Sequence, residues 1–112
     1  MARSQQLPGP WLTCEAVLSE AFFLVGPSGR KALAGFLRRG LVQVRFDLRS
    51  EREPVLRLMD KYGNLPMSLA DACLVRMTET LADPLVLTTD ADFRIYRRHS
   101  RQAVPCMVPR PL

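Results

Sequence analysis

The chain has 112 residues and a mass of 12.7 kDa, a length that predicts a single domain over residues 1–112. Its 47% hydrophobic and 24% charged residues are typical of a globular chain and exclude a disordered one. No apolar run approaches the roughly 20 residues that cross a membrane, so we expect no membrane contact. A net charge of +5, carried mostly by arginine, is typical of a nucleic-acid partner, although a genome rich in Arg codons would give the same balance.

The N-terminal half is predicted to form a strand, two helices and a second strand, at 11–14, 15–25, 28–39 and 41–46. Gly26 and Pro27 are expected to end the first helix, and Gly40 to end the second. The widely spaced cysteines Cys14, Cys73 and Cys106 match no metal-binding pattern, and the first ten residues lack the apolar stretch of a secretory signal. We therefore expect reduced thiols in a cytoplasmic protein.

The C-terminal half is predicted to form helices at 50–62 and 68–81, a strand at 85–88, a short basic helix at 90–99 and a last strand at 103–108. The alternation of strands and helices predicts an α/β fold with a mostly parallel sheet. Such a sheet binds ligands beyond the carboxyl ends of its strands.

Four carboxylates are candidates for a common site. Glu20 shares a helix face with Phe23 and Leu24, which predicts that its side chain points toward apolar packing and needs a compensating partner. Asp71 follows Ser68 by three residues, so a purely structural role for this acid is that of a capping box at the start of a helix. Asp90 and Asp92 follow the strand LVLT and could equally be acids of a helix start.

Together these acids predict a metal centre. Carboxylates that converge on one rim of a sheet repel one another unless a cation lies between them. Oxygen ligands without Cys or His favour Mg²⁺ or Mn²⁺, which can activate water for attack on a phosphodiester. The arginines of RIYRRHSR are the expected phosphate contacts, namely Arg94, Arg97, Arg98 and Arg101. A solvated basic helix face is the alternative for them.

Three stretches resemble PIN-domain proteins, and in particular the VapC-type toxin ribonucleases of toxin–antitoxin modules. They are LTCEAVLSEAFFLVG, residues 55–77 with their SLADACLVRM end, and LVLTTDADFRIYRR. The resemblance covers roughly residues 11–108 and implies a three-layer α/β sandwich with Mg²⁺-dependent cleavage of RNA. It implies that Glu20, Asp71 and Asp90 hold the metal with Asp92 as a helper. A cognate antitoxin and a homodimer are the implied partners.

One feature of the family has no counterpart in this sequence. PIN domains begin with a central strand that carries the first metal-site aspartate, whereas MARSQQLPGP contains neither a strand pattern nor an acid. We therefore expect an N-terminally truncated domain that binds Mg²⁺ weakly and cleaves RNA poorly, if at all. A non-catalytic remnant that binds antitoxin or RNA, and an unrelated α/β domain whose acids only cap helices, remain the alternatives.

Overall fold

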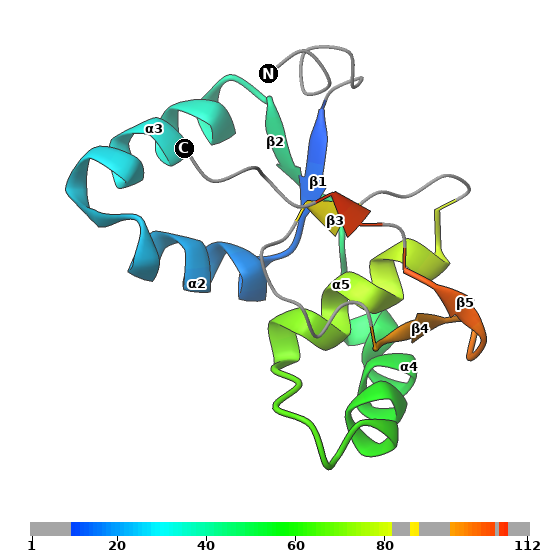
Figure 1. Cartoon of the computed structure of the whole chain (residues 1–112). Coiled ribbons are helices and arrows are strands. Elements are labelled where there is room, and N and C mark those ends of the chain that lie inside the picture. The colour runs from blue at the N-terminus through cyan, green and yellow to red at the C-terminus, as the bar shows by residue number, and fades with distance from the viewer. Residues whose placement is uncertain (1–9, 82–85, 88–94, 105, 108–112) are drawn as a thin grey trace. The chain divides into compact units, whose positions relative to one another are not determined.

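The computed structural model describes residues 10–81, 86–87, 95–104 and 106–107. The chain divides into two compact units, Met1–Asp47 and Leu48–Leu112, each of which is described by itself. Both contain helices and strands, so the fold is mixed α/β, as the sequence predicts (Figure 1).

The first unit is a parallel strand pair joined by two helices. Strands β1 (Trp11–Thr13) and β2 (Val42–Val44) pair in parallel, with Trp11 opposite Val42. Two parallel neighbours cannot be joined by a tight turn. Helices α2 (Glu15–Leu24) and α3 (Gly26–Arg38) supply the crossover connection (Figure 1).

The corner between α2 and α3 is sharper than the sequence predicts, because α3 begins at Gly26 and not at residue 28. Gly26 has a φ of 73°, a conformation that side chains disfavour, and it lets the chain reverse at once. Pro27 lies in the first helical turn, where a missing N–H leaves no bond unmade. Arg30 Nε then donates to Phe22 O at 3.2 Å and ties the two helices together.

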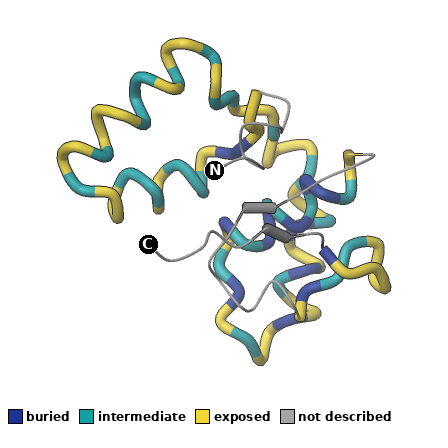
Figure 2. The backbone as a smooth tube through the Cα atoms, turned by 45° about the horizontal axis from the view of Figure 1, so that its top comes forward, coloured by how far each residue is buried: buried dark blue, intermediate teal, exposed yellow. Residues whose placement is uncertain are grey.

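The second unit holds most of the described buried residues (dark blue in Figure 2). Helices α4 (Leu48–Lys61) and α5 (Leu69–Glu79) pack against each other through apolar positions at helical spacing. Cys73 is 1% exposed and lies in this core. The apolar core of this unit comprises Val55, Leu58, Tyr62, Met67, Ala70, Ala72, Cys73, Val75, Met77, Tyr96 and Val104.

The C-terminal part differs from the prediction. Strands β4 (Arg97–Arg98) and β5 (Gln102–Ala103) form an antiparallel hairpin, so the predicted helix over 90–99 is wrong for its described residues, 95–99. The predicted strand over 103–108 is divided, because β5 belongs to this hairpin and β6 (Cys106–Met107) pairs in parallel with β3 (Val86–Leu87).

The hairpin turn explains why no helix forms there. His99 and Ser100 have φ values of 50° and 68°, and Arg101 N donates to Arg98 O at 3.3 Å across the turn. Positive φ at two successive residues is incompatible with a right-handed helix. Across the described residues, the strands form two parallel pairs and one antiparallel pair. No helix in the described part of the chain is long and apolar enough to cross a membrane.

Candidate functional site

Asp71 lies in the first turn of α5 and completes a capping box. Ser68 Oγ accepts a hydrogen bond from Asp71 N at 3.0 Å, and Asp71 Oδ2 accepts one from Ser68 N at 3.1 Å. The spacing Ser-x-x-Asp forms this pair because the first amides of a helix have no partners within it. The capping role predicted for Asp71 is therefore confirmed.

A buried tyrosine approaches the same carboxylate. Tyr96 is fully buried, and its hydroxyl lies 3.5 Å from Asp71 Oδ2. Its ring meets that of Tyr62 edge to face at 5.1 Å, and the Tyr62 hydroxyl accepts a hydrogen bond from Arg97 N at 2.9 Å. Both contacts to Asp71 use Oδ2, and no hydrogen bond from the described part of the chain reaches Oδ1. The Asp71 residue as a whole is half-buried.

Glu20 is exposed on α2, so the prediction that its side chain points toward apolar packing is wrong. Its neighbours Phe23 and Leu24 are 82% and 76% exposed, and no residue of α2 is buried. The apolar spacing predicts the helix correctly, but the face of α2 that carries Glu20, Phe23 and Leu24 packs on no core among the described residues. The argument that burial of Glu20 demands a partner therefore fails, and its role as a metal ligand stays a prediction.

The other predicted metal-site acids, Asp90 and Asp92, lie outside the described residues. Within the described ranges, no three His, Cys, Asp or Glu side chains are grouped so that they could hold a metal ion. Of the four acids in the predicted cluster, the structure therefore describes Glu20 and Asp71. Of these two, Asp71 is the one whose carboxylate has hydrogen bonds to described residues.

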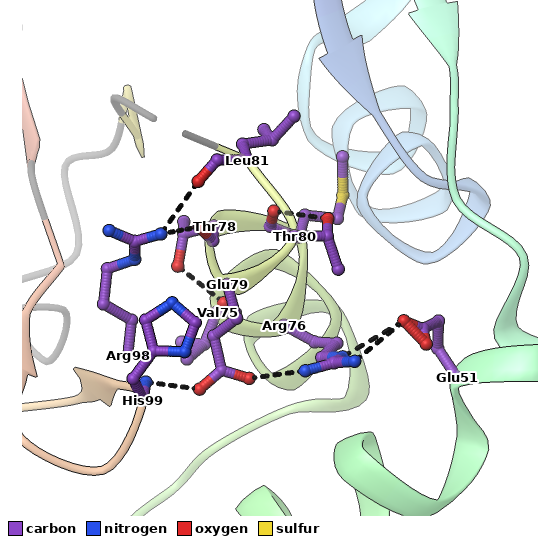
Figure 3. Close-up of polar contacts among 10 residues, drawn as sticks. Glu51, Val75, Arg76, Thr78, Glu79, Thr80, Leu81, Arg98 and His99 are labelled. Atoms are coloured by element: carbon purple, nitrogen blue, oxygen red, sulfur yellow. Dashed lines mark hydrogen bonds and ion pairs between the residues drawn. The ribbon is translucent and has the colours of Figure 1, made fainter. Parts of the chain in front are cut away.

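Three of the four arginines predicted to contact phosphate are described, and they lie on the β4–β5 hairpin and not on a basic helix. Arg94 lies outside the described residues. Arg98 Nη2 donates to Thr78 O and to Leu81 O, the latter at 2.9 Å, so this guanidinium satisfies carbonyls at the end of α5 (Figure 3). Arg97 Nη1 donates to Tyr96 O at 3.0 Å, whereas Arg101 is exposed.

A polar network that the sequence does not predict joins α4, α5 and the hairpin (Figure 3). Arg76 pairs with Glu51 at 3.1 Å and with Glu79 at 3.2 Å, and Glu79 Oε2 accepts a hydrogen bond from His99 N at 2.6 Å. Only the Arg76–Glu79 pair has a signal in the sequence, since residues three apart on a helix are neighbours. The other two contacts bring together residues 20 or more positions apart.

Comparison of the chain with protein-family models gives no match, and comparisons with curated proteins and with solved structures give none either.

Proposed function

We propose that the protein is a Mg²⁺-dependent endoribonuclease with a PIN-like three-layer fold, the toxin of a cytoplasmic toxin–antitoxin module. The proposal is supported by the resemblance of three sequence stretches to VapC-type ribonucleases. It is also supported by one structural observation, the half-buried carboxylate of Asp71, whose Oδ2 is held by Ser68 N and approached by the Tyr96 hydroxyl. The parallel pairs β1–β2 and β3–β6 agree with the mostly parallel sheet of that fold. The partners proposed from the resemblance are RNA, a cognate antitoxin and a second copy of the chain.

In this proposal Glu20, Asp71 and Asp90 hold the ion, and Asp92 assists them. The donor set fits, since carboxylate oxygens are the ligands that Mg²⁺ and Mn²⁺ prefer. A bound divalent ion supplies an activated water and stabilises charge at the phosphorus. Ser68 and Tyr96 act on Asp71, because both approach Oδ2 and so hold the plane of the carboxylate.

The second candidate is a non-catalytic PIN-like protein that binds antitoxin or RNA. A specific observation favours it: the capping box gives Asp71 a sufficient structural role without any metal.

Titration with Mn²⁺ followed by NMR separates these proposals, because a paramagnetic ion broadens the signals of nearby amides. We expect broadening of the α5 amides around Asp71, lost in Asp71→Asn and weakened in Glu20→Gln. Asp60→Asn, which removes an exposed acid from α4, is the matched control and is expected to leave the broadening unchanged.

Cleavage of a labelled single-stranded RNA, with MgCl₂ or with a chelator, completes the test. Slow cleavage that requires metal and Asp71 supports the ribonuclease. Broadening without cleavage supports the non-catalytic candidate. If Mn²⁺ broadens no α5 amide, or broadens them equally in Asp71→Asn, then Asp71 is only a helix cap and the metal centre is wrong.

A further inference from the structure

The positive charge of the chain is concentrated in one stretch. Between Ala21 and Phe46 the sequence contains five cations and no acid. This stretch alone therefore accounts for the net charge of +5, and the rest of the chain is balanced with eleven cations and eleven acids. The five cations are Arg30, Lys31, Arg38, Arg39 and Arg45, and all of them are exposed.

Four of these residues lie on or next to α3 and form what we term the α3 basic face: Arg30, Lys31, Arg38 and Arg39. At 100° per residue, Lys31 and Arg38 differ by only about 20° around the helix axis, with the other two on either side. The apolar Leu33 and Leu37 are half-buried, with Leu33 on the side away from Lys31 and Arg38 and Leu37 next to Arg30. The two pairs of cations are about 12 Å apart along the axis, at 1.5 Å per residue.

Two members of the α3 basic face are positioned by contacts that do not neutralise their charge. Arg30 Nε is held by Phe22 O, and the Arg39 guanidinium lies over the Phe36 ring, 5.6 Å from its centre. No member forms an ion pair with an acid in the described part of the chain, in contrast to Arg76, which pairs with Glu51 and Glu79.

Helix stability explains only part of this arrangement. Cations favour the C-terminal end of a helix, which accounts for Arg38 and Arg39. Arg30 and Lys31 lie beyond the first turn of α3, so the dipole does not favour them, and that turn contains no acid to balance them. Arg30 and Lys31 form no ion pair with a described acid, so a binding role explains their charges better than folding does.

We propose that the α3 basic face binds the phosphate backbone of single-stranded RNA. Arginine presents a planar fork that matches phosphate oxygens, and three of the four members are arginine. An anionic membrane fits less well, because a helix at a membrane surface buries its apolar side in lipid. On α3 the apolar Leu33 and Leu37 are already half-buried, and the helix packs against α2 and β2. The inference rests on the proposed function only for the choice of RNA as the polyanion.

Fluorescence anisotropy of a labelled single-stranded RNA, measured with a chelator over a series of salt concentrations, tests this inference. The variant Lys31→Gln/Arg38→Gln removes two cations that make no hydrogen bond or ion pair with a described residue. We expect roughly tenfold weaker binding, and a fall of about 1.4 in the slope of log K against log salt, because each phosphate contact on a single strand contributes about 0.7.

The matched control is Arg52→Gln/Arg57→Gln, which removes the same charge from exposed positions on α4. Acids three and four residues from Arg57, at Asp60 and Glu53, already balance that face. We expect its affinity and salt slope to stay close to those of the unmodified protein. Circular dichroism establishes that both variants keep their helices.

The inference is overturned if the two double variants weaken RNA binding equally, or if the unmodified chain binds phosphatidylserine vesicles and not RNA. Because the measurement contains no divalent ion, its result is independent of the metal centre. If Asp71 binds no metal but RNA binding still depends on the α3 basic face, then the proposed ribonuclease activity is wrong and the proposed RNA contact stands.

Discussion

Asp71 belongs to a capping box and is also the proposed metal ligand, so two tasks would fall to one carboxylate. Oδ2 caps α5 by accepting from Ser68 N, while Oδ1 receives no hydrogen bond from a described residue. A cap contributes about 1 kcal/mol to stability wherever it occurs, so it gives no information about metal binding by itself. The two tasks respond differently to a change that keeps the acceptor and removes the charge.

For Asp71→Asn we expect a small loss of unfolding free energy without metal, about 1 kcal/mol or less. The amide oxygen can still accept from Ser68 N, but the charge that favours the helix N-terminus is gone. Added Mg²⁺ should stabilise the unmodified chain, by about 1.4 kcal/mol at ten times its dissociation constant, and leave the variant unchanged.

Urea unfolding with and without MgCl₂ measures both effects. A gain in metal-free stability on neutralisation would show that Asp71 suffers repulsion from other acids, and that its cap is the weaker influence. An equal response of both proteins to MgCl₂ would contradict the assignment of Asp71 as a ligand.

At the scale of elements, the β4–β5 hairpin contains an unfavourable turn sequence. His99 and Ser100 both have positive φ, as in a type I′ turn, for which Asn-Gly is the preferred pair. We expect His99→Asn/Ser100→Gly to raise the unfolding free energy by about 0.5–1 kcal/mol, because relief of the left-handed strain exceeds the entropy cost of glycine.

Thermal unfolding measures this change, and Ser19→Gly is the control. Ser19 lies within α2, where glycine is expected to destabilise the helix by about 0.5–1 kcal/mol. Destabilisation by the turn variant would mean that the side chains of His99 and Ser100 contribute more than their backbone strain costs.

The helices could be predicted from the sequence, whereas the C-terminal strands could not. Apolar spacing and caps define α2 to α5 to within two residues at most ends. The segment around Arg97 and Arg98 looks helical because arginine is a good helix former. Its hairpin depends on contacts that are distant in sequence, such as Tyr96 with Asp71 and His99 with Glu79.

The candidate site divides in the same way. The cap formed by Ser68 and Asp71 is local, and its four-residue pattern is sufficient to predict it. The exposure of Glu20 is not local, since a helix period identifies a face but not whether anything packs on it. The hydrogen bonds from Arg98 to carbonyls at the end of α5 likewise depend on tertiary packing, which the spacing of residues in the sequence does not predict.

Across the whole chain, burial is unevenly shared between the two units. In 10–47 only Thr13 and Cys14 are buried, and α2 and α3 contain no buried residue. In 48–112 the described core includes Val55, Val75 and Tyr96, each fully buried. Since apolar burial is the main source of stability, the two units should differ in how readily their hydrogen bonds open.

We therefore expect hydrogen exchange to be slowest at the α5 amides and faster by orders of magnitude at those of α2 and α3. Helical hydrogen bonds alone protect little, because short isolated helices are marginal in water. Native-state exchange measured by NMR or mass spectrometry provides the comparison, with α4 as an internal reference. Equal protection of α3 and α5 would mean that the first unit is stabilised by contacts beyond the burial seen in 10–47.

The hydrogen bond from Arg98 to the end of α5 has a consequence for the two acids that lie between them in the sequence. By bonding to Leu81 O, Arg98 joins the two ends of the stretch that contains Asp90 and Asp92. Closing a loop in advance removes entropy that a ligand would otherwise have to overcome when it orders the chain. If Asp90 and Asp92 bind a cation as proposed, this closure by Arg98 would raise their affinity for it.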